Sequence, residues 1–101
     1  MGTINFIITA DTGEHVFNKG TFKYMYSSYT SGTTGSINIY FSAEGDLIRN
    51  DTITLTVTKR FMSNVIKHIA EKINLSGHDE IKHSQSTGLF KEITTMTYTA
   101  G

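Results

Sequence analysis

The stretch "DTITLTVTKRFMSNVIKHIAEKIN" (51–74) changes its hydrophobic period halfway along, and this change decides the fold. In "TITLTVT" (52–58), apolar residues alternate with threonine, which predicts a strand with one buried face. From Phe61 to Ile73, the apolar residues recur with helical spacing and form one wide stripe. We therefore predict a strand that is followed by one amphipathic helix over about 60–74.

Most other segments of the chain also show the alternation of β-strands. The clearest are "TINFIIT" (3–9), "TFKYMY" (21–26), "SINIYFS" (36–42) and "LFKEITTMTYTAG" (89–101). The pattern predicts an α+β, mainly β fold in which five or six largely antiparallel strands form a curved sheet or small barrel, with the helix before the last strand. No repeat or linker divides the chain, so we predict a single domain over residues 1–101.

Composition and charge exclude or disfavour several classes of protein. The chain has no cysteine, which excludes disulfides, thiolate zinc sites and cysteine nucleophiles. Nine basic and nine acidic side chains cancel, whereas nucleic-acid binders usually carry a basic excess. The first residues lack a basic n-region, and no segment reaches the ~18 apolar residues of a membrane helix. We therefore expect a soluble protein in the cytoplasm of the producing cell, without membrane contact.

The absence of proline and the abundance of threonine bear on assembly. Threonine is β-branched and tolerates solvent, so it suits the exposed face of a strand. Proline is one of the residues that block pairing at sheet edges. A proline-free, threonine-rich sheet therefore predicts a homo-oligomer that forms through sheet edges.

The segment "SGHDEIKHS" (76–84) holds the candidates for a metal site, His78, Asp79 and His83, and either His15 or His68 could complete such a site in space. The two histidines are five positions apart, which places them about 140° apart on a helix and on opposite faces of a strand. Neither geometry matches a usual zinc motif. We therefore interpret the segment as a polar loop and predict no cofactor, and whether the loop binds an ion is left open.

The aromatic stretch "KGTFKYMY" (19–26) has a partial likeness to the signature of RNA-recognition sheets, in which alternating aromatic residues stack on bases. A second basic group, Lys59 and Arg60, lies near the N-terminus of the predicted helix, where the helix dipole disfavours cations. The candidate contacts to nucleic acid or to a protein partner are Phe22, Lys23, Tyr24, Tyr26, Lys59 and Arg60. The stripe of Tyr24 and Tyr26 fits a core strand, a subunit interface or a ligand groove, and a core or subunit-facing strand is favoured over base stacking because tyrosine suits surfaces that are partly apolar and partly wet.

Catalytic signatures are missing from the sequence. It has no G-x-S-x-G turn and no phosphate loop with its lysine. The one enzymatic alternative is a metal-assisted hydrolase around His78 and His83, and no small-molecule substrate is indicated. We therefore predict a protein that is not an enzyme.

Three segments carry a resemblance to a known group of proteins: "YFSAEGD" (40–46), "DTITLTVTKRFMSNVIKHIAEKIN" (51–74) and "ITTMTYTAG" (93–101). Together they resemble small structural proteins encoded by marine tailed phages, in which a threonine-rich strand leads into an amphipathic helix and a final threonine-rich strand follows. This resemblance implies a virion or assembly component without catalytic residues.

The predicted architecture also resembles Sm-like small β-barrels, which pair strand edges into rings and can bind RNA. Those proteins place their helix before the strands and carry an Arg-Gly strand signature, and this chain has neither feature. We predict a non-enzymatic, self-associating structural module, with a nucleic-acid-binding small barrel as the alternative.

Overall fold

The computed structural model describes residues 2–8, 13–29, 32–43, 46–82 and 92–101. Its strands are β1 (Thr3–Ile8), β2 (Gly13–Asn18), β3 (Phe22–Tyr29), β4 (Thr34–Ala43), β5 (Asp46–Thr58), β6 (Asp79–Lys82) and β7 (Ile93–Thr99). The helix α1 spans Met62–Asn74, and two short 3-10 turns, η1 (Lys19–Thr21) and η2 (Lys59–Phe61), precede β3 and α1.

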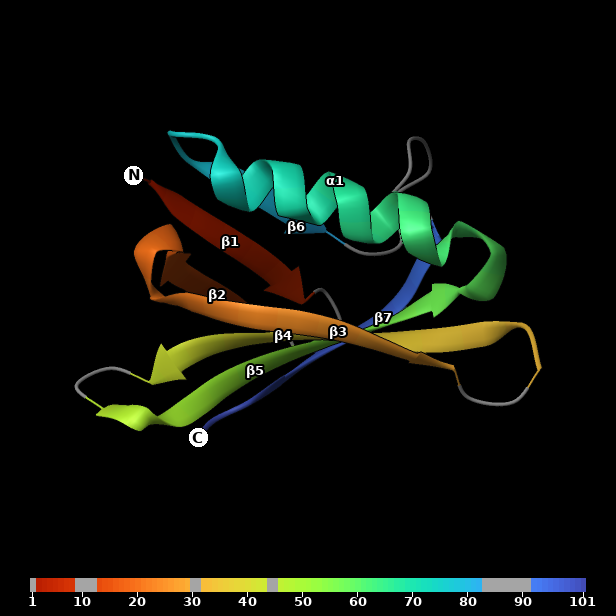
Figure 1. The fold of residues 1–101 in the computed structure, drawn as a ribbon, viewed down its shortest axis with the longest axis horizontal. Helices are drawn as coiled ribbons and strands as arrows, with labels where there is room; N and C mark the ends of the chain where they lie inside the picture. Colours follow the sequence, from red (N-terminus) through yellow and green to blue (C-terminus); the bar gives the residue numbers. More distant parts are fainter. Residues whose placement is uncertain (1, 9–12, 30–31, 44–45, 83–91) are drawn as a thin grey trace.

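The strands form two sheets. Sheet A has three strands in the order β2-β1-β6, and sheet B has four strands in the order β3-β4-β5-β7. Neighbouring strands are antiparallel except β1 and β6, which are parallel. Figure 1 shows α1, β1 and β6 on the same side of sheet B, so the helix and sheet A together cover one face of the larger sheet.

The structure confirms the mainly β, α+β class and corrects the finer architecture. The described residues form seven strands in two sheets and no closed barrel, where we predicted five or six strands in one curved sheet or barrel. The helix also precedes two strands, β6 and β7, and not only the last one. The second difference arises from β6, a short strand within the segment 76–84 that we interpreted as a loop. Ile81 is the only buried residue of this strand.

Alternation along β5 explains how the sequence specifies sheet B. Ile53, Leu55 and Val57 are fully buried on one face, while the threonines between them lie on the other. β5 is the longest strand and lies between β4 and β7, so its apolar face forms the centre of the core. Each fully buried aliphatic side chain of this kind contributes about 1.5–3 kcal/mol through the hydrophobic effect.

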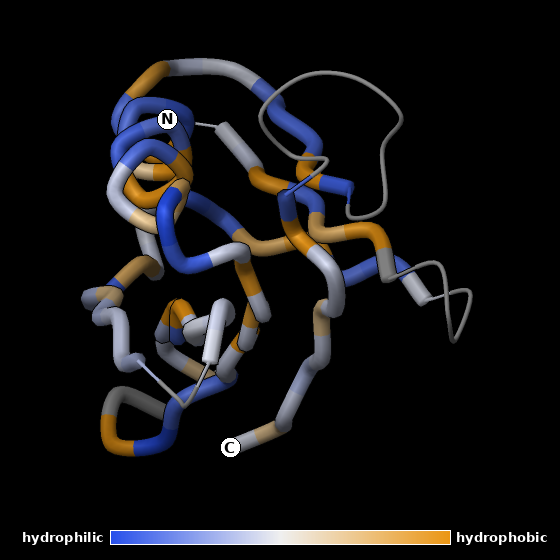
Figure 2. The backbone as a smooth tube through the Cα atoms, turned by 90° about the vertical axis from the view of Figure 1, so that its right-hand side faces the viewer, coloured by the Kyte–Doolittle hydropathy of each residue, from blue (hydrophilic) through white to orange (hydrophobic). Residues whose placement is uncertain are grey.

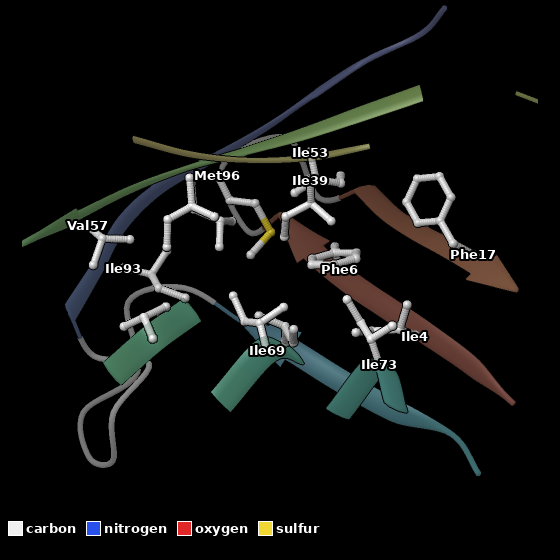
Figure 3. Packing of buried hydrophobic residues seen from close by; sticks show 14 of the residues in the cluster. Ile4, Phe6, Phe17, Ile39, Ile53, Val57, Ile69, Ile73, Ile93 and Met96 are labelled. Carbon is white, nitrogen blue, oxygen red and sulfur yellow. The ribbon is translucent and has the colours of Figure 1, made fainter. Parts of the chain in front are cut away.

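One hydrophobic core is shared by both sheets and the helix. Figure 3 shows Ile69 and Ile73 of α1 facing Ile4 and Phe6 of β1, with Ile53 of sheet B on the other side. The apolar stripe of α1 thus packs into this core, and Figure 2 shows hydrophilic and hydrophobic residues segregated around the helix. The predicted amphipathic helix is therefore confirmed, with its first α-helical residue two positions later than the predicted start.

Candidate functional site

The outer face of sheet B, which is turned away from α1 and sheet A, is the candidate functional site. It comprises Tyr24, Tyr26 and Ser28 of β3, Ser36, Asn38 and Tyr40 of β4, Thr52, Thr54 and Thr56 of β5, and Thr95, Thr97 and Thr99 of β7. The strand register aligns these side chains in rows across the sheet, one of which is Tyr26, Asn38, Thr54 and Thr97. None of these side chains is charged, and the opposite face of the same strands is core.

Three tyrosines form a stacked cluster at the β3 side of this face. The ring centroids of Tyr24 and Tyr40 are 4.6 Å apart with an interplanar angle of 24°, and those of Tyr26 and Tyr40 are 5.8 Å apart with an angle of 9°. Tyr24 is 51% exposed and Tyr26 is 47% exposed, although both are large and partly apolar. Stacking turns ring faces toward neighbouring tyrosines, so the cluster offers less open ring surface to a nucleic-acid base than isolated tyrosines would.

Contacts within the cluster favour the neutral form of Tyr40. A hydrogen bond with Tyr26, together with burial, raises the pKa of Tyr40 from 10.0 to about 12. The phenol of Tyr40 therefore stays uncharged at neutral pH. Next to it, the Thr54 hydroxyl donates a 2.9 Å hydrogen bond to the side-chain oxygen of Asn38, which fixes the polar part of the face.

The aromatic stripe predicted from the sequence is partly wrong. A β-bulge between Phe22 and Tyr24 places Phe22 on the core face, where its ring meets that of Phe41 at 5.9 Å. The bulge residue Lys23 donates a 2.6 Å hydrogen bond from Nζ to Asn50 Oδ1. Tyr40, which was not among the contact candidates, takes the place of Phe22 in the cluster.

The second basic group lies elsewhere. Lys59 Nζ is 5.0 Å from the ring centroid of Tyr29, and the Arg60 guanidinium is 5.0 Å from that of Phe61. Tyr29 follows Tyr26 by three residues in a regular part of β3, so it lies on the opposite face of the sheet. The structure therefore does not combine Lys59 and Arg60 with Tyr24 and Tyr26 into one surface.

Lys59 and Arg60 line a cavity of about 550 Å³ at the start of α1. The cavity also contains Thr33, Thr58 and the carboxylate of Glu92. No acidic residue lies in the first turn of α1, and no side chain caps it. The positive end of the helix dipole therefore lies next to the two cations. Glu92 balances part of this positive charge, and the cavity is therefore mixed in character.

Two of the three metal candidates, His78 and Asp79, have separate partners in the structure. His78 Nδ1 is 2.7 Å from Thr3 Oγ1, while the carboxylate of the adjacent Asp79 pairs with the ammonium of Lys19 at 2.6 Å. His83 lies outside the described residues, and among those described no group of three or more His, Cys, Asp or Glu side chains could hold a metal. Asp79 therefore has a structural partner in place of a metal.

Lys19 is a buried cation whose burial was not predicted from the sequence. Its side chain is 0% exposed, and Nζ also donates a 2.8 Å hydrogen bond to the backbone oxygen of Leu75 just after α1. Lys19 is the main cause that lowers the pKa of Asp79, and Lys72, at 3.5 Å, adds to it. The alternation of β2, in which Phe17 is buried and Asn18 is exposed, continues to Lys19 and is the signal that could have placed it inside.

A further cleft of about 410 Å³ opens between β2 and sheet B. His15 stacks on Tyr98 with ring centroids 4.1 Å apart, and burial is the first cause that raises the pKa of Tyr98. Asp51 hydrogen-bonds with Tyr98 and accepts a 3.0 Å hydrogen bond from the backbone amide of Gly101. The raised pKa makes the Tyr98 phenol a weaker acid, so it stays protonated at neutral pH.

The chain matches no protein-family model, no curated protein and no solved structure. Within the described residues, no helix is long and apolar enough to cross a membrane. Any function must therefore be argued from the geometry of the chain itself.

Proposed function

We propose that the chain is a non-enzymatic structural module that self-associates through sheet B. The observation that carries this proposal is the outer face of sheet B, an uncharged array of threonines with a stacked cluster of tyrosines at one side. The cores of protein interfaces are enriched in tyrosine and depleted of charged residues relative to the rest of the surface. The twelve outward side chains named above carry no charge across four strands, which fits a protein contact better than it fits plain solvent exposure.

The tyrosine cluster is suited to such a contact for an energetic reason. The rings of Tyr24 and Tyr26 already stack on Tyr40, so they lose little side-chain freedom when a partner covers them. A partner that covers these half-exposed rings removes apolar surface from water. The tyrosine hydroxyls can still form hydrogen bonds at the rim of the contact. The resemblance to marine tailed phage proteins suggests a virion or assembly component as the setting, which neighbouring capsid or tail genes would test.

The test is the molar mass in solution over a range of concentrations, measured by light scattering. We expect the mass of the wild-type protein to rise above that of the monomer as concentration increases. Tyr24→Lys, in the tyrosine cluster at the β3 side of the outer face, should weaken association because it places an unpaired charge in the contact. Ser63→Lys is the matched control, since it adds the same charge on the exposed side of α1. A wild-type protein that is monomeric at every concentration contradicts the proposal.

Nucleic-acid binding is the second candidate, and the half-exposed rings of Tyr24 and Tyr26 with Lys23 beside them favour it. Such a site would bind single strands by stacking and lose affinity steeply as salt increases. Fluorescence anisotropy with a labelled oligonucleotide measures this directly. The zero net charge and the separate location of Lys59 and Arg60 make it the weaker candidate, and absence of binding at low salt would exclude it.

A further inference from the structure

We infer that β3 is the strand through which two copies of this chain join, by antiparallel pairing of β3 with β3 of a second copy. Sheet B would then continue across both molecules as one sheet. This inference rests on the proposed self-association and names the surface that mediates it.

β3 is an edge strand of sheet B among the strands that the structure describes. Among the described strands, sheet B has its edges at β3 and β7, and sheet A has its edges at β2 and β6. An edge strand presents a row of free N–H and C=O groups that can pair with another strand. β6 has only four residues and β2 has six, whereas β3 has eight, so β3 offers the longer ladder in comparison with either edge of sheet A.

The usual protection of an edge strand is missing from the regular part of β3, Tyr24–Tyr29. Such strands are normally blocked by proline, by charged side chains or by bulges. β3 has no proline, and its bulge lies at the start, which leaves Tyr24–Tyr29 in regular register with β4. Its one charged residue is Lys23, whose ammonium is directed to Asn50 of β5 at 2.6 Å. The regular part of the strand therefore carries no charge that would repel a second copy.

The other edge of sheet B is less suitable. The pairing of β7 with β5 is interrupted near its start, between Thr56 and Val57, which leaves a shorter regular ladder than that of β3. Its outer face carries threonines and no aromatic ring, so a contact there would bury less apolar surface. β3 instead exposes three tyrosines, Tyr24, Tyr26 and Tyr29, at 51%, 47% and 58%.

Two-fold symmetry allows this pairing to bring tyrosines of both copies together. Directly opposed residues of an antiparallel pair point to the same face of the sheet. The outer faces of both copies therefore align only if even-numbered residues of one β3 lie opposite even-numbered residues of the other. One such register places Met25 opposite Met25 and Tyr24 opposite Tyr26, and the next places Tyr26 opposite Tyr26. Cross-strand aromatic pairs each contribute favourably, so either register extends the tyrosine cluster across the seam.

The expected contact is a weak one. Six residues of strand span about 20 Å, and an edge contact of this length falls at or below the ~1,200 Å² of total buried area that separates stable from transient complexes. We therefore expect a dimer that dissociates on dilution.

The test compares two lysine substitutions in one row of the outer face. Tyr26→Lys places a charge at the β3 edge, and Thr97→Lys places the same charge in the same row at the β7 edge, about 14 Å away at three strand spacings. Measured by analytical ultracentrifugation, the dimer dissociation constant should rise at least tenfold for Tyr26→Lys and less than twofold for Thr97→Lys. Equal weakening by both variants would indicate face-to-face association, and weakening by Thr97→Lys alone would indicate the β7 edge. Either result overturns the β3 assignment.

A measurement on the wild-type protein covers the case in which Tyr26→Lys does not fold. Backbone amide exchange within residues 24–29 should slow as concentration rises, at alternate positions, because only every second amide points away from β4. Exchange within residues 95–99 should not change with concentration. A dimer without added protection in residues 24–29 overturns the β3 assignment but leaves self-association intact, whereas a monomer at all concentrations refutes the proposed function as well.

Discussion

Removal of the carboxylate from Asp79 should destabilise the fold more than removal of its buried partner. Asp79→Ala leaves the ammonium of Lys19, whose side chain is 0% exposed, with only the backbone oxygen of Leu75 as acceptor. Lys19→Met removes the charge and keeps an apolar stem of similar length in the core. It leaves Asp79 21% exposed to water and 3.5 Å from Lys72, so the remaining carboxylate is not stranded.

The expected magnitudes follow from this asymmetry. Breaking a buried ion pair by removing one partner costs about 3–5 kcal/mol, and the partial exposure of Asp79 places Asp79→Ala near about 3 kcal/mol. Lys19→Met should cost about 1–1.5 kcal/mol, the typical net contribution of the lost hydrogen bonds. The double variant should be more stable than Asp79→Ala alone, because it contains no unpaired buried charge.

Urea unfolding of the wild type, the two single variants and the double variant gives these free energies. The free energy of unfolding at acidic pH is a second measurement. Because Lys19 lowers the pKa of Asp79, the pair contributes stability above the ordinary aspartate pKa of 3.8, and this contribution is lost as pH falls through the lower pKa of the folded state. The Lys19→Met variant should therefore lose less stability in acid than the wild type. Equal costs for the two single variants, or a double variant weaker than Asp79→Ala, would refute this reasoning.

Three further predictions concern other parts of the molecule. Tyrosine absorbance should reveal one phenol that titrates near pH 12, and the free energy of unfolding should fall between pH 10 and 12 because the unfolded chain ionises first; titration of every tyrosine near 10 would contradict the raised pKa of Tyr40. Phe6→Ala should cost about 3–5 kcal/mol in urea unfolding, since the ring is fully buried, and Val16→Ala at 58% exposure should cost less than about 0.5 kcal/mol. Gly2→Ala should lower the free energy of unfolding by about 1–3 kcal/mol, because the methyl group of the alanine would collide with the backbone of Gly77. An unchanged melting temperature would show that the two segments move apart easily.

The elements that the sequence predicts well are those with a strong hydrophobic period. β5 and α1 follow the alternation and the helical stripe of 51–74 almost residue by residue, because each has one fully buried face. β6 was missed for the opposite reason, since Ile81 is the only buried residue among four and charged neighbours surround it. Its pairing with β1 is a long-range contact, which no local pattern encodes.

The candidate site shows the same division. The sequence left open whether Tyr24 and Tyr26 lie in the core, and the structure places both rings half-exposed on the outer face of sheet B. The bulge after Phe22 shifts the alternation by one residue and carries no signature in the sequence, so the predicted face of Phe22 was wrong. The separation of Lys59 from the tyrosines depends on the relative position of the two ends of sheet B, and that follows only from the register of whole strands.

The parallel pairing of β1 with β6 has a consequence for the order of folding. Sheet B joins β3, β4 and β5 through antiparallel neighbours in the chain, which close short loops at low entropic cost. β1 is made first, yet its partner β6 comes after α1, and Ile4 pairs with Asp79 only when most of the chain is available. Contacts of such long sequence separation slow folding, so completion of sheet A should be the late step. The ion pair of Lys19 and Asp79, which joins the same distant segments, would then form only in molecules that have finished folding.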